Sequence, residues 1–435
     1  MFLKSRKVLI YGFSDSGKQA ALLALSEGAD VYVYDDGNIP ELTEGVTLVT
    51  SEQAAPDADI VIISPGVPFD RPLLERARLA GKEVIGETEF AYRFCKSDII
   101  AVTGTNGKTT TTMLINRILN MAGQSSYALG NIGIPLSAKV KELQPSQTVV
   151  LEVSSFQLES TVTFSPDISV ILNLAPDHID RHGSYPNYIN AKCKIFENQV
   201  KRDKAVLNYD DADTQALAQR CPADVFYFSK SERVRGAYVK GGRICFEDKR
   251  ASVICPVKDL SLTGGHNLDN ALAAVAAAKL KGVDDDIISH ALKTFELPDF
   301  RMQFIGSKCG KDFYNDSKGT NVAATLAAVR SVSGDSLLIL GGSDKGENFD
   351  DLFANLPDSV KYVLVSGANA DKIIESAARC KKFNVFKRDN LENCVTESLS
   401  FAVKNVIFSP SSASFDRFID YKDRGRAFNR YFNGL

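Results

Sequence analysis

The chain has 435 residues, of which 44% are hydrophobic and 24% are charged, and its formal net charge is −3 at pH 7. This length exceeds what one hydrophobic core supports and predicts about two to four domains of ordinary globular composition. The slightly acidic balance argues against a nucleic-acid-binding protein, which needs a clustered basic surface, and no stretch is apolar over the length of a membrane span.

The eight cysteines are scattered along the chain and include no CxxC pair. This pattern favours free thiols over a disulfide framework or a zinc site, and free thiols are typical of the cytoplasm. We therefore expect a cytoplasmic, monomeric protein that acts on small molecules, with no nucleic-acid or membrane partner.

The first region is predicted to begin a nucleotide-binding α/β unit. A strand at Lys7–Tyr11, a helix over Gln19–Glu27 and a strand at Asp30–Tyr34 form a βαβ pattern. In the connecting sequence GFSDSG, Ser14 stands where the dinucleotide fingerprint has its middle glycine. The same run imitates a phosphate loop, but it lacks the hydroxyl after the lysine that would bind a metal ion, so we assign no triphosphate to it.

Two further features of this region suit a nucleotide. Asp35 and Asp36 follow the second strand, where an acid can contact a ribose or a base. Asp59–Ser64 predicts another strand, which runs into the turn Pro65-Gly66-Val67-Pro68.

The most informative motif is TGTNGKTT at 103–110, which follows the apolar run 99–102 and precedes a helical pattern. Strand, glycine-rich loop and helix form the geometry in which backbone N–H groups and a helix N-terminus bind phosphates. Lys108 can then reach the terminal phosphates, and the Thr109 hydroxyl can ligate Mg²⁺. The motif predicts that the protein binds a nucleoside triphosphate.

This loop is a variant of the general pattern G-x-x-x-x-G-K. Its first glycine would stand at position 102, which is Val102, and Gly104 lies nearby instead.

Around this loop the sequence alternates strands and helices. Thr148–Val153, Ile168–Leu174 and Ala205–Asn208 predict buried parallel strands, and the stretch 224–257 predicts an antiparallel edge. The segment Asn267–Leu280 is rich in alanine and favours a helix.

Polar side chains follow two of these strands, at the edge where open parallel sheets build their sites. Glu152 ends the first strand and can hold the Mg²⁺ of a bound triphosphate; a solvent-facing glutamate is the alternative. The run DHIDRHGS at 177–184 follows the second strand, and His178 can ligate a second metal ion, with a purely structural loop as the alternative. Lys192 lies on the next predicted helix.

The pattern breaks near Leu297-Pro298, and a third α/β unit follows from Asp312. Its predicted strands are Ser336–Leu340, Tyr362–Ser366 and Asn405–Phe408.

Further candidate ligand groups lie at helix starts and strand ends. Asn267 and Asn270 are three residues apart and share a helix face, where paired amides can bind an adenine edge or, alternatively, cap the helix. In the third unit, the loops NDSKGTN at 315–321, LGGSDKGENF at 340–349 and SPSSASFDRF at 409–418 carry lysines and hydroxyls that suit a small anionic ligand.

These motifs, in this order, resemble those of the Mur ligase family, ATP-dependent amide-forming enzymes of peptidoglycan precursor synthesis, over essentially the whole chain. The resemblance implies an α/β fold of three domains: an N-terminal Rossmann-like UDP-sugar-binding domain at 1–95, a central P-loop ATPase-like parallel sheet that binds ATP at 96–297, and a C-terminal Rossmann-like amino-acid-binding domain at 298–435. The SPGV turn at 64–67 and the SPSSASFDRF run are most similar to family members that add D-glutamate to UDP-N-acetylmuramoyl-L-alanine through an acyl phosphate.

The resemblance also implies roles for individual residues. Lys108 contacts the γ-phosphate, and Thr109 and Glu152 hold one Mg²⁺. His178 and Lys192 hold a second Mg²⁺, the lysine as a carbamate, and Lys194 is the nearby competitor for that role.

Four further groups of residues are implied by the resemblance. The other loop residues around the phosphates are Gly104, Thr105, Asn106, Gly107 and Thr110, and adenosine and phosphates are held by Asn267, Asn270, Arg301 and Asp316. The uridine diphosphate end of the acceptor is assigned to Ser14, Ser16, Asp35, Asp36 and Gly66, and its sugar to Asn131. D-Glutamate is assigned to Lys318, Thr320, Lys345, Ser414, Phe415 and Tyr421, with the lysines pairing with its carboxylates.

One departure from the family pattern lies at the entry to the third domain. The family usually has a Pro-His-Arg run there, whereas this chain has Pro298-Asp299-Phe300-Arg301, in which Arg301 is the best match.

Three other functions share parts of the pattern. A folylpolyglutamate synthetase has the loop and the chemistry, but it would not be expected to carry a nucleotide-type unit at 1–95. A P-loop switch that hydrolyses ATP slowly needs no loops for two further substrates, and a non-catalytic sensor of a cell-wall nucleotide does not need Lys108, Glu152 and His178. A ligase differs from these because it hydrolyses ATP only when both the acceptor and the amino acid are present.

Overall fold

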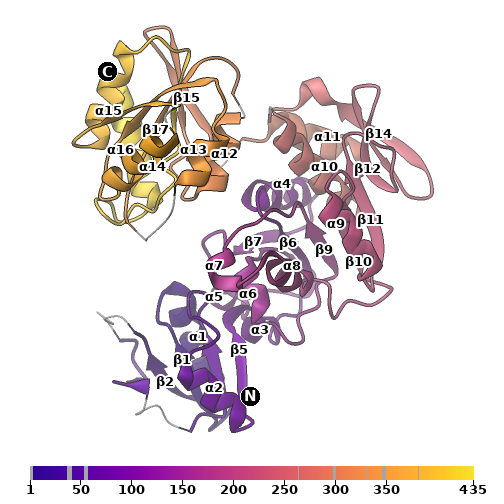
Figure 1. Cartoon of the computed structure of the whole chain (residues 1–435). Coiled ribbons are helices and arrows are strands. Elements are labelled where there is room, and N and C mark those ends of the chain that lie inside the picture. Colours follow the sequence, from indigo (N-terminus) through magenta and orange to yellow (C-terminus); the bar gives the residue numbers. More distant parts are fainter. Residues whose placement is uncertain are drawn as a thin grey trace. The chain divides into compact units, whose positions relative to one another are not determined.

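In the computed structural model, the chain folds around three β-sheets (Figure 1). The structure describes residues 3–36, 42–52, 57–262, 264–296, 300–330, 332–344, 349–380 and 382–435. The chain divides into two units: the first consists of Met1–Ser261 with Asn267–Phe295, and the second of Leu262–His266 with Glu296–Leu435. The first unit contains two of the sheets and the second unit contains the third.

The first sheet is parallel and has the strand order β3-β2-β1-β4-β5. Its elements are β1 (Lys7–Tyr11), α1 (Asp15–Ser26), β2 (Asp30–Tyr34), β3 (Val46–Leu48), β4 (Ile60–Ile63), α2 (Pro72–Leu79), β5 (Glu83–Gly86) and α3 (Glu87–Tyr92). The strand order reverses between β1 and β4, so the loops that follow these two strands border one crevice at the carboxyl edge. The predicted βαβ opening is confirmed, with a helix that begins earlier than expected, at Asp15.

The second sheet has nine strands in the order β14-β13-β12-β11-β10-β9-β6-β8-β7. Its strands are β6 (Asp98–Thr103), β7 (Ser126–Gly130), β8 (Thr148–Glu152), β9 (Ile168–Ile171), β10 (Lys204–Asn208), β11 (Asp224–Ser229), β12 (Gly236–Lys240), β13 (Arg243–Glu247) and β14 (Ala251–Pro256). The helices of this region are α4 (Lys108–Met121), α5 (Leu136–Lys139), α6 (Ser155–Glu159), α7 (Ile179–His182), α8 (Tyr185–Cys193), α9 (Ala212–Ala216), η2 (Leu217–Gln219), η3 (Val257–Asp259), α10 (Gly265–Leu280) and α11 (Asp285–Thr294).

The antiparallel edge predicted for 224–257 begins later than expected. β11 pairs in parallel with β10, and β12 pairs in parallel with β11, so only the β12–β13 and β13–β14 pairs of this stretch are antiparallel. The predicted central strands are parallel, and β6 lies between β8 and β9. The loop that follows β6 is therefore flanked by the chain that leaves β8 and the chain that leaves β9.

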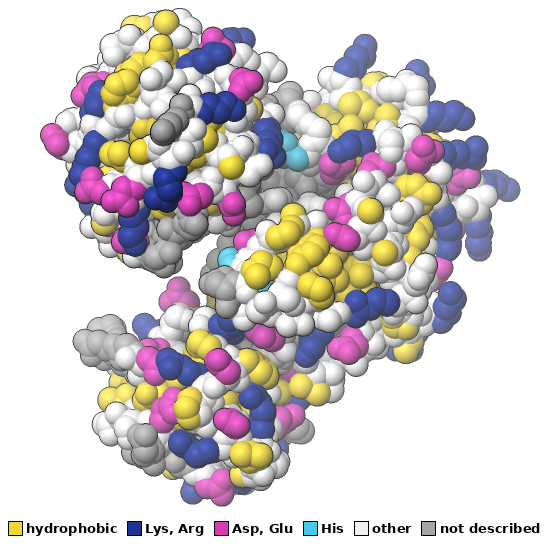
Figure 2. All heavy atoms as spheres, viewed as in Figure 1, with side chains coloured by type: hydrophobic (Ala, Val, Ile, Leu, Met, Phe, Trp, Pro, Cys, Tyr) yellow, Lys and Arg dark blue, Asp and Glu magenta, His cyan; other side chains and the backbone are white. Residues whose placement is uncertain are grey.

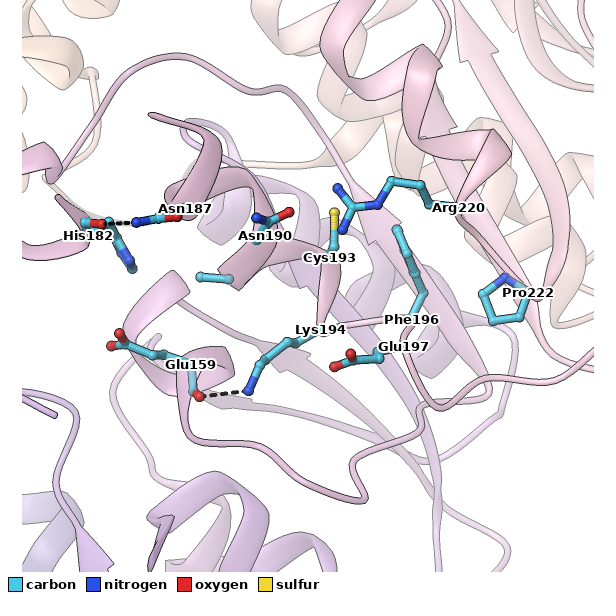
Figure 3. A pocket seen from close by; sticks show the side chains of 11 residues that line it. Glu159, His182, Asn187, Asn190, Cys193, Lys194, Phe196, Glu197, Arg220 and Pro222 are labelled. Atoms are coloured by element: carbon cyan, nitrogen blue, oxygen red, sulfur yellow. Dashed lines mark hydrogen bonds between the residues drawn. The ribbon is translucent and has the colours of Figure 1, made fainter. Parts of the chain in front are cut away.

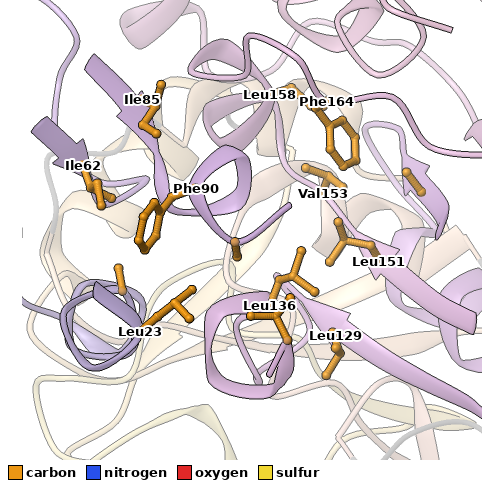
Figure 4. Packing of buried hydrophobic residues seen from close by; sticks show 14 of the residues in the cluster. Leu23, Ile62, Ile85, Phe90, Leu129, Leu136, Leu151, Val153, Leu158 and Phe164 are labelled. Carbon is orange, nitrogen blue, oxygen red and sulfur yellow. The ribbon is translucent and has the colours of Figure 1, made fainter. Parts of the chain in front are cut away.

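One hydrophobic cluster runs through the first two sheets (Figure 4). It includes Leu23 of α1, Phe90 of α3, Leu136 of α5 and Leu151 of β8, and these side chains are at most 3% exposed. Helices α1, α3 and α5 pack on one another, so burial of apolar area holds the first sheet to the second.

Two buried carboxylates of α3 strengthen this junction. Glu87 accepts hydrogen bonds from the Ser137 backbone N (2.9 Å) and Oγ (2.5 Å), and burial raises its pKa. Burial alone would also raise the pKa of Glu89, but hydrogen bonds from Thr163 Oγ1, Val162 N and the Arg93 guanidinium bring it below its usual value. Glu89 is therefore buried as a carboxylate.

The third sheet has the order β15-β16-β20-β17-β18-β19 and is parallel except for the β15–β16 pair. Its elements are β15 (Gln303–Lys308), β16 (Lys311–Asn315), α12 (Val322–Arg330), β17 (Ser336–Leu340), α13 (Asp350–Asn355), β18 (Val360–Val365), α14 (Ala370–Cys380), β19 (Asn384–Lys387), α15 (Leu391–Glu397), η4 (Ser398–Ser400), β20 (Asn405–Phe408) and α16 (Tyr421–Asn433). Leu337 and Ile339 pack in one hydrophobic cluster while Leu338 and Leu340 pack in another, so helices cover both faces of the sheet.

The α/β fold with three parallel-rich sheets agrees with the sequence prediction. Among the described helices, none has the length and apolarity needed to cross a lipid bilayer. Over most of the face shown in Figure 2, Lys and Arg side chains lie among Asp and Glu side chains.

Candidate active site

The TGTNGKTT loop joins β6 to α4 and turns through two glycines of positive φ, Gly104 (150°) and Gly107 (85°). A Cβ on Gly104 would lie 2.9 Å from Leu172 Cβ, and a Cβ on Gly107 would lie 2.1 Å from Asn270 Oδ1, so neither position accepts a side chain. Gly107 is the N-cap of the 14-residue helix α4 and gives it no side-chain cap. An uncapped helix N-terminus after a glycine-rich loop is a phosphate-binding geometry.

Asn173, just beyond β9, holds the loop in this shape. Its carbonyl oxygen accepts a hydrogen bond from Thr105 N (3.0 Å), its Oδ1 accepts one from Asn106 N (2.9 Å), and its Nδ2 donates to the Asn106 carbonyl (3.1 Å). Thr105 Oγ1 also lies 2.9 Å from the Tyr188 hydroxyl of α8. The loop is thus fixed by its neighbours in the sheet before any ligand binds.

Two lysines converge on this loop. Lys108 Nζ donates to the carbonyls of Gly104 and Thr105, both at 2.8 Å, and Lys192 Nζ donates to the same Gly104 carbonyl at 2.9 Å. Lys192 is only 2% exposed. Burial, and then the Lys108 charge, lower the pKa of Lys192 well below its usual value, and the Asp177 charge opposes this only in part. Such a lysine is easily held as a neutral amine.

Lys194 does not compete with Lys192 for this place. Its Nζ donates to the carbonyls of Glu159 (2.9 Å) and Thr161 (3.4 Å), on the other side of α8. There it lines a cavity of about 780 Å³ together with Asn187, Asn190, Ala191 and residues of the neighbouring elements (Figure 3). Asn190, Ala191 and Lys194 are three, four and seven residues after Asn187, so all four share the face of α8 that lines the cavity. Tyr188 and Lys192 lie on the face that contacts the phosphate loop.

Glu152 and Asn131 meet at the ends of β8 and β7. Glu152 is 2% exposed, and its Oε1 accepts a hydrogen bond from Asn131 Nδ2 at 2.9 Å. Its other oxygen, Oε2, is buried and has no hydrogen-bond partner among the described residues. A buried carboxylate oxygen without a donor is costly unless a cation neutralises it, so this side chain fits a metal ion.

His178 stands at the N-cap of α7 in the left-handed region, with φ 52°. Its ring packs on Phe156 at 4.8 Å between centroids and its Nε2 lies 3.6 Å from Asp177 Oδ2, while the side chain stays 44% exposed. A non-glycine residue in this conformation is held by its surroundings and is typical of functional sites. The second histidine of the loop, His182, is instead buried, 3.0 Å from Ser155 Oγ, and burial lowers its pKa.

The described residues contain no group of three or more His, Cys, Asp and Glu side chains placed to hold a metal ion. A metal ion at this edge would therefore need other donors, such as the Thr109 hydroxyl, Lys192 or the phosphates of a nucleotide.

Asn267 and Asn270 are both buried on α10, at 9% and 4% exposure. Asn270 Oδ1 accepts a hydrogen bond from Thr111 Oγ1 of α4 (3.3 Å), and its Nδ2 donates to Asn267 Oδ1 (3.4 Å). The pair thus ties α10 to the phosphate loop, and Asn270 packs directly against Gly107. That these amides also bind an adenine remains a prediction.

In the first sheet, the predicted nucleotide residues lie around the crevice between β1 and β4. Ser16 Oγ lies 3.4 Å from Ser64 Oγ, which donates to the Gly12 carbonyl (2.7 Å), and Ser14 Oγ lies 3.5 Å from Ser16 Oγ. Asp35 Oδ2 accepts a hydrogen bond from Phe13 N (2.5 Å), so it fixes the β1–α1 loop.

The two remaining residues of this group differ in their surroundings. Asp36 forms an ion pair with Arg71 and accepts hydrogen bonds from the hydroxyls of Tyr11 (3.3 Å) and Tyr34 (3.1 Å). Gly66 is exposed in the turn after β4.

In the second unit, Asp316 directly follows β16 and is buried, at 5% exposure. Its Oδ2 accepts a hydrogen bond from Ser409 Oγ (2.7 Å) and its Oδ1 accepts one from Met302 N (3.1 Å). Burial raises the pKa of Asp316 to about 6, against the opposing effects of Ser409 and the nearby Arg301 charge. Arg301 and Asp316, which the resemblance assigns to the same nucleotide, therefore lie near each other.

The chain around Arg301 has an unusual backbone. Phe300 and Met302 both have positive φ, at 64° and 45°, and Phe300 packs on Gly425, where a Cβ would lie 2.3 Å from its ring. Two such residues flanking one arginine store strain at this point, as functional sites often do.

The residues predicted for the amino acid lie on loops of the second unit. Lys318 Nζ lies 5.4 Å from the Tyr421 ring centre, Ser414 is buried and Phe415 is 67% exposed. Thr320 is half-buried and immediately precedes the residue that caps α12. Lys345 lies outside the described residues.

Arg424 joins these loops to one another, and the sequence analysis missed it. Its guanidinium is 2% exposed and donates to Ser317 Oγ (3.1 Å) and to the carbonyls of Ser317 (2.9 Å), Ser412 (2.9 Å) and Ala413 (3.0 Å). Burial lowers its pKa to about 10. Each of its partners belongs to a loop that the sequence assigns to the amino acid.

Comparisons with known proteins identify the family of this chain. Residues 102–278 match the family model of the Mur ligase middle domain. UDP-N-acetylmuramoylalanine–D-glutamate ligase of Caldanaerobacter subterraneus is 38% identical over 99% of this chain and 98% of its own length, and the ligase of the same name from Koribacter versatilis is 40% identical over 98% of this chain and 97% of its own length.

Solved structures of lower identity show the same fold. UDP-N-acetylmuramate–alanine ligase of Thermotoga maritima has a TM-score of 0.61 at 22% identity and covers 99% of this chain and 100% of its own. MurF ligase of Thermotoga maritima in complex with ADP has a TM-score of 0.60 at 16% identity, and covers 99% of this chain and 96% of its own.

Proposed function

Because this chain belongs to the Mur ligase family, we propose that it joins D-glutamate to UDP-N-acetylmuramoyl-L-alanine with conversion of ATP to ADP and phosphate, a step of peptidoglycan precursor synthesis. The observation that carries this proposal is the arrangement at the end of β6. A phosphate loop there lies beside the half-satisfied carboxylate Glu152 and the buried Lys192, in a chain whose relatives match it along nearly their whole length.

In this proposal the triphosphate of ATP lies on the TGTNGKTT loop and the N-terminus of α4. Lys108, which donates to two loop carbonyls, exchanges those bonds for the γ-phosphate. The amides Asn267 and Asn270 lie next to the loop, and Arg301 and Asp316 are assigned to the same nucleotide by family likeness alone.

Two Mg²⁺ ions would neutralise the charge that builds up on the transferring phosphoryl group. Glu152 and Thr109 would hold one of them, and the orphaned Oε2 of Glu152 supports this assignment. His178 and Lys192 would hold the other. A lysine whose pKa is lowered by burial is a nucleophile for carbon dioxide, and the resulting carbamate would be an anion that suits a cation.

The reaction has two chemical steps. The γ-phosphoryl group passes from ATP to the carboxylate of the L-alanyl end, which gives an acyl phosphate and ADP. The amine of D-glutamate then attacks the acyl carbon, loses a proton, and the tetrahedral intermediate collapses to the amide and inorganic phosphate. The side chains mainly position and neutralise charge, because phosphoryl transfer needs little covalent help.

The other substrates are assigned by domain. The boundaries 1–95, 96–297 and 298–435 belong to this proposal, with the uridine diphosphate end of the acceptor at the crevice between β1 and β4 and Asn131 near its sugar. D-Glutamate is assigned to the loops around Lys318, Ser414 and Tyr421, together with Lys345. The cytoplasmic location and the monomeric state expected from the sequence remain predictions.

The test is phosphate release from ATP and Mg²⁺ with each substrate omitted in turn. Release that requires both UDP-N-acetylmuramoyl-L-alanine and D-glutamate is the expected result. Release with a different amino acid would keep the mechanism and change the specificity. Release that is independent of the acceptor would show a simple ATPase and overturn the proposal.

A further inference from the structure

Arg181 lies on α7, three residues after His178, and its side chain is 16% exposed. Its Nη2 donates to the Val67 carbonyl at 2.8 Å and its Nη1 to the Gly66 carbonyl at 3.4 Å. The same guanidinium lies 3.4 Å from Glu159 Oε2. One side chain of the second sheet's ligand edge therefore holds the turn that follows β4 in the first sheet.

This contact differs from the apolar junction between the two sheets. The junction is made by α1, α3 and α5, whereas Arg181 acts on the SPGV turn at the carboxyl edge. An arginine fork that donates to two successive carbonyls fixes both the distance and the orientation of that turn, which a single ammonium does not do.

The guanidinium is also coupled to His178 through an aromatic ring. It lies 4.9 Å from the centre of the Phe156 ring, and the His178 ring packs on Phe156 at 4.8 Å. Phe156 belongs to α6, which directly follows the strand that ends at Glu152. Arg181, Phe156 and His178 thus form one packed group that extends from the SPGV turn to the candidate metal residues.

We propose that Arg181 is a positioning residue that holds the SPGV turn in register with His178, so that an acceptor bound at that turn presents its carboxylate in line with the γ-phosphate. This inference rests on the proposed function for the identity of the acceptor. In-line transfer is sensitive to such register, because a misplacement of about 1 Å can cost about 10²-fold in rate.

The experiment compares Arg181→Met, Arg181→Lys and the wild type. For Arg181→Met we expect kcat to fall and KM for UDP-N-acetylmuramoyl-L-alanine to rise, each by about 10-fold or more, while KM for ATP stays within about 2-fold. Arg181→Lys keeps the positive charge but loses the fork and the planar stack, and should recover only part of the loss.

Arg93→Met is the matched control, because Arg93 is similarly buried (19% exposed) and paired with Glu83 and Glu89 at the apolar junction. It should lower the thermal midpoint and leave the kinetic constants of the folded enzyme near those of the wild type. If Arg181→Met behaves like this control, or if its three kinetic constants match the wild type, the inference is wrong.

A readout without turnover separates this inference from the proposed function. Val67 N donates to the Ser64 carbonyl (3.0 Å), so hydrogen exchange at Val67 reports opening of the turn. Arg181→Met should speed this exchange by about 10-fold or more, and Arg93→Met should not. Unchanged exchange in Arg181→Met would overturn the inference even if the ligase reaction is confirmed. If the wild type does not use the acceptor, the proposed function is wrong, and the exchange at Val67 still tests whether Arg181 holds the turn.

Discussion

The phosphate-loop edge of the first unit and the loop cluster around Arg424 in the second unit both bury charged groups, but they satisfy them differently. Glu152 keeps one buried oxygen that has no partner among the residues the structure describes, and Lys192 shares the Gly104 carbonyl with Lys108. Arg424, by contrast, donates to several carbonyls and to a serine hydroxyl of three loops. The first edge leaves Glu152 incompletely paired, while the second gives each nitrogen of the Arg424 guanidinium an acceptor.

We interpret this difference as one between side chains that bind a ligand, such as Glu152, and side chains that hold the loops of a site in place, such as Arg424. A buried charge without a full set of partners is costly, so it is retained where a ligand completes it. A buried guanidinium with a full set of acceptors stabilises the loops around it instead. Substitutions in the first region should therefore impair chemistry more than stability, and substitutions at Arg424 should do the reverse.

The largest effect is expected for Lys108→Ala. Loss of the charge proposed to contact the γ-phosphate should lower turnover by about 10²–10³-fold or more, with an unchanged circular dichroism spectrum. Lys194→Ala is the control, since Lys194 faces the cavity on the other side of α8, and its turnover should stay near that of the wild type. Near-normal turnover of Lys108→Ala would show that the assignment of TGTNGKTT as the phosphate-binding loop is wrong.

Lys192→Ala should also lose activity, but in a recoverable way. An added short carboxylate such as acetate should restore part of the turnover, because it would replace the carbamate proposed beside a second metal ion. Titration of acetate against Lys192→Ala and Lys108→Ala distinguishes the two lysines, since only the first should respond. Full activity without acetate would assign Lys192 a structural role.

Arg424→Met should act mainly on stability. The carbonyls of Ser317 and Ser412 would lose the Arg424 donor while remaining buried, and the Ala413 carbonyl would keep only the hydrogen bond from Ser343 N, at a cost of about 3 kcal/mol in the free energy of unfolding. Denaturant unfolding measures this cost, and the kinetics should show a raised KM for D-glutamate with little change in KM for ATP. A variant as stable as the wild type would show that the cluster is not the scaffold described above.

The smallest effect is expected for the pH dependence of stability at Asp316. Its pKa is about 6 in the folded protein because of burial, compared with about 4 in an unfolded chain. Protonation of Asp316 therefore stabilises the folded protein, and this stabilisation is complete below about pH 4. As the pH rises to about 6, the free energy of unfolding should fall by at most about 3 kcal/mol.

Asp316→Asn removes this dependence, because the amide stays neutral. As the pH is raised from about 4 to about 6, the thermal midpoint of Asp316→Asn should therefore rise relative to that of the wild type. Above about pH 6 the difference between the two midpoints should stay constant. A difference between the two midpoints that does not change with pH would contradict the raised pKa.

Local pattern was enough for the strands and the phosphate loop. The strands Lys7–Tyr11, Ser336–Leu340 and Asn405–Phe408 are confirmed at both ends, because each is a short run rich in β-branched or leucine side chains, a length and composition that favour a buried strand over a helix. The loop TGTNGKTT was recognisable because the phosphate geometry requires glycines and a lysine within a few residues.

The sequence by itself also placed Glu152 and His178 at one sheet edge, since the carboxyl ends of parallel strands meet there. Lys192 was predicted as a site residue only from the resemblance to the Mur ligase family. Only the tertiary structure decided between Lys192 and Lys194, because the helix face that points to the loop is set by what packs against α8. Arg181 and Arg424 were invisible in the sequence for the same reason: their partners are mostly backbone carbonyls from distant segments, and a carbonyl carries no sequence signal.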